Sequence, residues 1–372
     1  MHIIMRKTVV ASDSFKGCLS SAQVADAVEK GIHEVYPDCE VVKLAVADGG
    51  EGTIEALALT LGGSIVEVQV QDPLGRLIPA EYAIVDGTTA VIEMSRASGL
   101  TLLKEEERNP MLTSTYGTGQ MVADALAKGC RRFIMGIGGS ATNDAGTGML
   151  EALGYRFMDA EGNLLKGRGE SLRKLQHIDS SNAVAGLKDS SFIVACDVDS
   201  PFCGLKGAAY VYGPQKGATP EMVRELDEGM LAFSRLIYKE TGTDVMNIKG
   251  AGAAGGLGGA LKAFMDADLK KGADMVLDAI GFDQTIKDAD LVITGEGKID
   301  GQTLNGKLPS AVARRASARK IPVIAICGRT DVESLPCFAR ICPVTPQEMP
   351  LEQAMQPDIA MENIKEKAKI LK

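Results

Sequence analysis

Short apolar runs of strand length recur along the chain, and most of them stop at glycine or at a charged residue. Such runs occupy 8–11, 41–47, 133–137, 192–196 and 291–294. Helix-compatible segments with apolar residues every three or four positions follow several of these runs, as expected for amphipathic helices. Strand-loop-helix units at both ends of the chain therefore predict an α/β fold with a parallel sheet.

Two helices have clear boundaries in the sequence. Ser20 and Gln23 have the spacing of a capping box, so a helix is predicted to start there. Thr219 followed by Pro220 opens a second amphipathic segment, which Gly242 ends.

The middle of the chain has a different pattern. The runs at 64–70, 80–85 and 89–93 are separated by turn residues and predict hairpin-like strands. We therefore expect a two-domain α/β protein with its active site in the cleft between the domains. One domain would combine 1–75 with 285–372, and 76–284 would form an inserted mixed α/β domain.

Composition narrows the class of protein. The 372 residues are 45% hydrophobic and 24% charged, with a net charge of -9 that argues against a nucleic-acid or anionic-membrane partner. Three histidines and no C-x-x-C pair argue against structural zinc. Without a signal peptide or an apolar span in the sequence, a cytoplasmic location is expected.

The most distinctive stretch is 133–148, where an apolar run leads into glycines and small polar residues. Backbone amides at Gly138 and Gly139 could cradle an anion together with Ser140 and Asn143. Asp144 would repel a bare phosphate and is easier to explain beside phosphate-bound Mg²⁺. Two other interpretations stay open. They are an ordinary tight turn and a dinucleotide fingerprint formed by Gly136, Gly138 and Ala141 with Asp159 as the ribose acid.

Charged loops follow other predicted strands, where the ligands of parallel sheets bind. Asp13 and Lys16 follow the first strand, and Asp48 and Glu51 follow the second among three glycines. Asp197 follows the run at 192–196 and could act as a base. Each loop could instead be an ordinary solvated turn.

Two arginines are candidates for gripping a substrate carboxylate. They are Arg76 and Arg96, and a surface position is the alternative for both.

The last charged loop holds Glu296, Lys298 and Asp300, with Lys307 shortly after. Residues 301–308 fit G-x-x-x-x-G-K but have Leu308 where a P-loop needs a hydroxyl, so a true P-loop is rejected. The lysines could neutralise phosphate while the acids hold metal.

These loops share lysine, carboxylate and glycine, and none of the three histidines lies in one of them. This inventory disfavours hydrolysis by a Ser-His triad and fits phosphoryl transfer, which relies on positioning and electrostatics.

Four ordered motifs resemble the bacterial glycerate kinase family, type 1. They are the segments 12–17, 47–52, 136–146 and 294–300, and the likeness extends to 72–76 and 195–199. The resemblance implies a flavodoxin-like part and Mg²⁺-assisted phosphorylation of D-glycerate by ATP, giving 2-phosphoglycerate. A nicotinamide-dependent oxidoreductase and a non-catalytic sugar-acid sensor are the alternatives, and a homodimer is left open.

Residue roles are assigned by chemistry rather than by resemblance. Lys16 and Lys307 are placed on phosphate and Asp197 on the substrate hydroxyl as base. The other expected binding residues are Asp13, Arg76, Arg96, Gly138, Gly139, Ser140, Asn143 and Lys298. The expected metal ligands are Asp48, Glu51, Asp144, Glu296 and Asp300.

Overall fold

The computed structural model describes residues 5–47, 52–304 and 307–371, which fold into two compact units. The first unit comprises 1–48, 55–61 and 273–372, and the second comprises 49–54 and 62–272. The expected α/β fold is confirmed. The boundaries near 75 and 285 and the placement of the active site in a cleft stay predictions.

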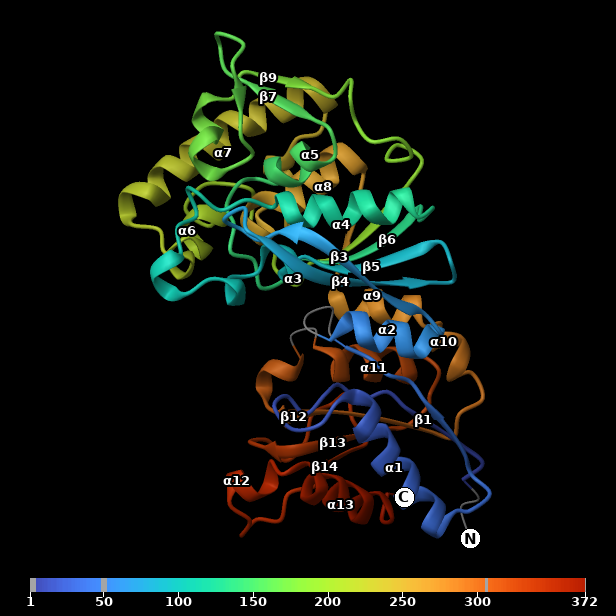
Figure 1. Cartoon of the computed structure of the whole chain (residues 1–372). Helices are drawn as coiled ribbons and strands as arrows, with labels where there is room; N and C mark the ends of the chain where they lie inside the picture. Colours follow the sequence, from blue (N-terminus) through green and yellow to red (C-terminus); the bar gives the residue numbers. More distant parts are fainter. Residues whose placement is uncertain (1–4, 48–51, 305–306, 372) are drawn as a thin grey trace. The chain divides into compact units, whose positions relative to one another are not determined.

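The first unit contains a parallel sheet of five strands in the order β14-β13-β12-β1-β2 (Figure 1). Numbered as they occur within this unit, the strands run 2-1-3-4-5 across the sheet, which is the flavodoxin-like order. The strands are β1 (Lys7–Val10), β2 (Glu40–Lys43), β12 (Leu291–Ile299), β13 (Val323–Thr330) and β14 (Arg340–Pro343).

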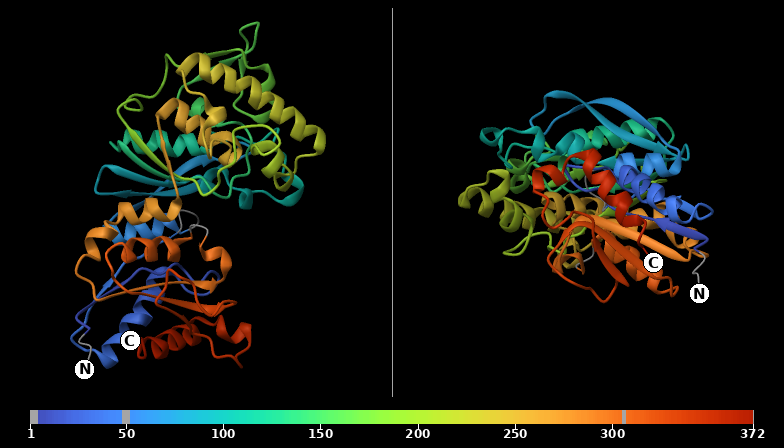
Figure 2. Two further views of the ribbon diagram at one scale, coloured as in Figure 1. Left: turned by 180° about the vertical axis from the view of Figure 1, so that it is seen from behind. Right: turned by 90° about the horizontal axis from the view of Figure 1, so that it is seen from below.

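Helices cover both faces of this sheet. Figures 1 and 2 show α1 (Ser21–Val35) and α13 (Pro357–Ala368) on one face and α11 (Leu308–Ser317) on the other. The capping box of α1 is confirmed, because Ser20 and Gln23 exchange hydrogen bonds between side chain and backbone. The remaining helices of this unit are α2 (Thr53–Leu61), α9 (Gly272–Ala279), α10 (Phe282–Thr285) and α12 (Leu351–Ala354), with the first residues of α2 and α9 in the second unit.

Two strand predictions need correction. The predicted strand at 291–294 continues to Ile299, because Lys298 and Ile299 keep their pairing with β13. The residues predicted as the start of a charged loop are therefore strand. The predicted strand at 41–47 ends at Lys43, where its pairing with β1 stops.

The second unit is built on a six-stranded mixed sheet in the order β11-β10-β6-β5-β4-β3 (Figure 1). Strands β3 and β4 form an antiparallel hairpin that continues antiparallel onto β5, and the other pairs are parallel. The strands are β3 (Ser64–Gln71), β4 (Leu77–Val85), β5 (Thr89–Glu93), β6 (Arg132–Gly136), β10 (Ser191–Ala195) and β11 (Asp268–Lys270). A three-stranded sheet joins β7 (Arg156–Met158), β8 (Leu164–Leu165) and β9 (His177–Asp179).

Helices pack with this sheet around one large apolar core. The predicted boundaries of α7 (Pro220–Thr241) are confirmed, since Thr219 caps its start and Gly242 ends it with a φ of 76°. The other helices are α3 (Ser95–Ser98), α4 (Tyr116–Ala127), α5 (Thr147–Ala152), α6 (Ala208–Tyr212) and α8 (Leu257–Met265). Across the described ranges of both units, no helix is sufficiently long and apolar to span a bilayer.

Candidate functional site

The glycine-rich loop between β6 and α5 folds around the side chain of Asp144. This carboxylate is fully buried and accepts hydrogen bonds from Thr115 N (2.7 Å), Thr115 Oγ1 (2.8 Å), Gly146 N (3.0 Å) and Gly148 N (3.2 Å). Burial raises the pKa of Asp144, and the hydrogen bonds act against that rise. The side chain of Asp144 thus takes up the backbone amides of Gly146 and Gly148 at the start of α5. The metal role of Asp144 stays a prediction.

The loop also receives a lysine that sequence reasoning missed. Lys216 is buried, and its Nζ donates to Ser140 Oγ at 2.8 Å and to the carbonyl oxygen of Thr142 at 2.6 Å. Burial lowers the pKa of Lys216 from 10.5 to about 7, while the charge of Asp144 opposes this shift. A lysine in the turn-like sequence Gly213-Pro214-Gln215-Lys216-Gly217 reads as exposed, so the sequence carried no signal of its burial.

Asn143 points into the interior of the second unit. Its Nδ2 donates to Met230 Sδ at 3.2 Å, and its buried Oδ1 has no hydrogen-bond partner within the described ranges. The neighbouring Thr142 Oγ1 is also buried without one. A buried polar atom without a hydrogen bond lowers the stability of the folded state. Two such atoms in adjacent residues therefore distinguish this loop from an ordinary tight turn.

Three of the predicted binding residues line one cavity of about 540 Å³ in the second unit. They are Arg96, Gly138 and Gly139. The Nε of Arg96 lies 3.2 Å from Oε2 of Glu93, whose Oε1 accepts from Ile54 N at 3.1 Å. The walls also carry two further carboxylates, from Glu67 and Glu81.

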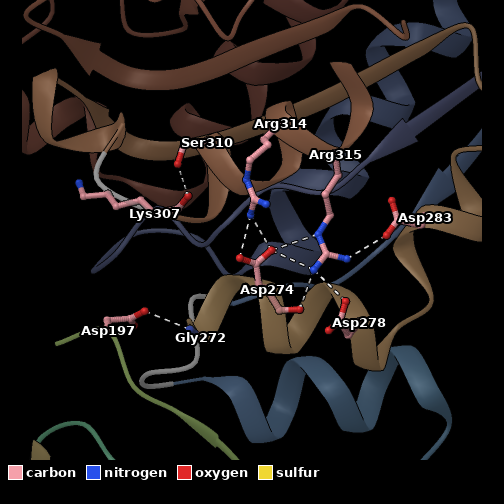
Figure 3. A network of polar contacts seen from close by, with 9 residues as sticks. All are labelled: Asp197, Gly272, Asp274, Asp278, Asp283, Lys307, Ser310, Arg314 and Arg315. Carbon is pink, nitrogen blue, oxygen red and sulfur yellow. Dashed lines mark hydrogen bonds and ion pairs between the residues drawn. The ribbon is translucent and has the colours of Figure 1, made fainter. Parts of the chain in front are cut away.

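Arg76 and Asp197 take part in local contacts elsewhere in this unit. Asp72 is buried and bonds Arg76 through Nε and the backbone amide, while Glu107 lies 2.6 Å from Arg76 Nη1. Asp197 is exposed, and its Oδ1 accepts from Gly272 N at 3.0 Å (Figure 3). The predicted roles of both residues, on a substrate carboxylate and as base, stay predictions.

In the first unit, two predicted lysines line a second cavity of about 370 Å³. Lys16 comes from the loop after β1 and Lys298 from the end of β12. Arg329 and Asp331, which were not predicted, also line this cavity, and Lys298 Nζ lies 2.6 Å from Asp331 Oδ2. That ion pair raises the pKa of Lys298.

Of the residues predicted as a charged loop, Glu296 lies within β12, and Asp300 and Lys307 come after that strand. Glu296 is almost buried and accepts from Thr303 Oγ1 at 2.7 Å and from Lys307 Nζ at 3.0 Å. The hydroxyl of Thr303 also accepts from Asp300 N at 3.2 Å. Glu296 therefore pairs directly with Lys307, and Thr303 links the Glu296 carboxylate to the backbone amide of Asp300.

Asp13 lies in the loop that follows β1. It is nearly buried, its Oδ1 accepts from Ser14 N at 2.7 Å, and its amide donates to the carbonyl oxygen of Gly295 at 2.9 Å. Asp48 and Glu51, predicted as metal ligands, lie outside the described residues.

The position of Asp159 does not suit the dinucleotide interpretation. It lies in the tight turn between β7 and β8, where its carboxylate accepts from the amides of Glu161 and Asn163 and from the Asn163 side chain. A ribose-binding acid is expected at the end of a strand of the main parallel sheet.

Comparison with known proteins gives a consistent result. A model of the glycerate kinase family matches residues 8–371. Glycerate 2-kinase of Escherichia coli K12 is 47% identical over 323 residues, covering 87% of this chain and 85% of that protein. Glycerate kinase of Bacillus subtilis 168 is 45% identical over 355 residues, covering 94% and 93%. A structure described as glycerate kinase 2 from Salmonella typhimurium LT2 matches with a TM-score of 0.91 and 43% identity, over 98% and 96% of the two chains.

Proposed function

The chain belongs to the glycerate kinase family, and from this premise we propose that it phosphorylates the 2-hydroxyl of D-glycerate with ATP. The match over 8–371 carries the proposal, and the relative named glycerate 2-kinase supports the position of transfer. In this reaction the bond between the γ-phosphorus and the ADP oxygen breaks, a bond to the glycerate oxygen forms, and the hydroxyl proton passes to a base. The oxidoreductase and sensor alternatives have no support among these relatives.

In this proposal, positively charged and neutral groups bind the phosphates, and a carboxylate accepts the proton. Lys16, Lys298 and Lys307 would offset phosphate charge, and the amides of Gly138 and Gly139 with Ser140 would hold an anionic group. Asp197 would accept the hydroxyl proton, and its exposed carboxylate suits a group that must reach a substrate. Phosphoryl transfer needs no covalent intermediate with the enzyme, so positioning of this kind suffices.

The substrate carboxylate would be bound by Arg96 or Arg76, and Asp13 and Asn143 would complete the contacts. Both arginines already have carboxylate partners within the chain. A glycerate carboxylate would therefore share or replace an existing partner, and the guanidinium of Arg96 has the further advantage of lining a cavity.

Mg²⁺ is part of the proposal. Within the described ranges, no three His, Cys, Asp or Glu side chains form a group ready to hold a metal ion. A kinase Mg²⁺ needs only one or two carboxylates, because phosphates and water supply the other ligands. Glu296 and Asp300 fit that smaller requirement, and Asp48, Glu51 and Asp144 remain further candidates. The bound ion would offset the negative charge of the phosphates.

A phosphorus NMR time course with D-glycerate and MgATP tests the reaction directly. A growing 2-phosphoglycerate resonance, matched by loss of ATP, is expected. Formation of 3-phosphoglycerate would leave the kinase activity and refute the position of transfer, and unchanged ATP would refute the kinase activity.

We also propose a homodimer in the cytoplasm. Light scattering from purified protein would give twice the chain mass of 39.2 kDa if the dimer forms. A measured mass equal to one chain would contradict it.

A further inference from the structure

The strand order of the first unit indicates where a ligand could bind at the carboxyl ends of its parallel strands. From β1 the chain moves to β2 on one side, whereas β12, β13 and β14 lie in succession on the other side. The order thus reverses between β1 and β12. In open parallel sheets, ligands bind beyond the carboxyl ends of the strands at such a reversal.

The cavity of about 370 Å³ lies at this edge. Lys16 follows β1, Lys298 and Arg329 lie near the ends of β12 and β13, and Thr345 follows β14. Its volume falls in the range of roughly 300–1,000 Å³ that is usual for small-molecule sites. Topology and cavity therefore indicate the same location independently.

The lining of this cavity has two chemical characters. Among the described residues of the lining, Lys16, Lys298 and Arg329 supply cationic groups and Asp331 supplies a carboxylate. Most of the apolar lining comes from α12, α13 and the residues next to them, and the loop after β1 adds to it. The apolar residues are Phe15, Cys18, Val344, Leu351, Ala354, Met355 and Ala360. A flat apolar ring joined to a polyanion needs this combination.

We propose that this cavity binds the ATP of the reaction, an inference that rests on the proposed kinase function. The purine lies against the apolar lining around Ala354 and Met355, and the phosphates extend toward Lys16, Lys298 and Arg329. When ATP binds, the ammonium group of Lys298 either leaves Asp331 for a phosphate oxygen or contacts both groups. The cavity of the second unit is less suited to a triphosphate, because Glu67, Glu81 and Glu93 line it beside one arginine.

Photolabelling locates the purine. The full chain is irradiated with 8-azido-ATP without glycerate, digested and mapped by mass spectrometry, with unlabelled ATP as competitor. Label on peptides covering 344–363, removed by the competitor, is expected. Competable label on peptides covering 93–102 or 136–140 would overturn the proposal.

Calorimetry tests the cationic lining with a matched control. Lys298→Met should weaken binding of MgATP at least tenfold, since it removes one phosphate-facing charge. Lys30→Met should bind like the wild type, because Lys30 is an exposed residue of α1 outside the cavity lining. Equal affinities for the two variants would contradict the assignment.

The proposed function can fail separately from this site. Label at 344–363 without phosphorylation of glycerate would support the cavity as a nucleotide site and refute the glycerate kinase activity. Phosphorylation of glycerate with label only in the second unit would refute the cavity assignment alone.

Discussion

Replacing Lys216 by methionine should change how the stability of the protein depends on pH. The lysine is buried, and its ammonium group has two hydrogen-bond acceptors, Ser140 Oγ and the carbonyl oxygen of Thr142. Methionine keeps the length of the side chain and removes the titrating group. The comparison therefore isolates the free energy of charging one buried amine.

The magnitude follows from the lowered pKa. Burial lowers the pKa of Lys216 from 10.5 to about 7. Between those two values the unfolded chain binds a proton at this residue and the folded chain does not, so stability rises with pH. From pH 7 to pH 9 this one group should add about 2 kcal/mol to the free energy of unfolding, roughly a 30-fold change in the unfolding equilibrium.

Urea unfolding followed by far-ultraviolet circular dichroism at pH 7 and pH 9 measures this difference, with a reductant present to keep the cysteines as thiols. The wild type should gain about 2 kcal/mol more than Lys216→Met over this interval. The exposed Lys206→Met serves as control and should follow the wild type. Equal pH dependence of wild type and Lys216→Met would refute a neutral buried lysine.

Three further predictions concern packing, charge and catalysis. Gly31→Ala should lower the free energy of unfolding by about 1–3 kcal/mol in urea titrations, because its Cβ would lie 2.2 Å from a backbone carbonyl of α13. Gly301→Ala, with nothing within 4 Å of its Cβ, should change it little. Burial acts to raise the pKa of Asp274, but the hydrogen bonds and charges of Arg315 and Arg314 together outweigh it and lower that pKa (Figure 3). Their stabilisation exists above the unfolded-state pKa and is lost as pH falls, so Arg315→Met should destabilise more at pH 7 than at pH 3 in thermal unfolding. Asp197→Asn should keep wild-type melting and lose most of its turnover in a coupled kinase assay, and retained turnover would exclude a role as base.

Local chemistry made parts of the fold predictable. The start of α1 depends on Ser20 and Gln23, and the limits of α7 depend on Thr219, Pro220 and Gly242. These residues act on the backbone within one turn, so their effect can be read from neighbouring letters. The alternation of strand and helix likewise gave the α/β class.

The features that could not be predicted depend on contacts between residues far apart in the sequence. The extension of β12 to Ile299 depends on its pairing with β13, a strand whose residues come more than twenty positions later. The burial of Lys216 depends on Ser140 and Thr142, more than seventy positions earlier in the chain. Neither pairing has a local signature, because tertiary contacts override the preferences of short segments.

The glycine-rich segment 250–259 packs against the loop between β6 and α5, and this packing explains why glycine is needed at one of its positions. The amide of Ala145 donates to the carbonyl oxygen of Gly255 at 2.9 Å, and a Cβ on Gly255 would lie 2.1 Å from the carbonyl oxygen of Thr142. Close approach of two backbones therefore explains the glycine at position 255. Asp144 and Lys216 hold the same loop through buried hydrogen bonds. These contacts would hold the proposed anion-binding amides of the loop in place before a ligand binds, and electrostatic catalysis requires such preorganisation.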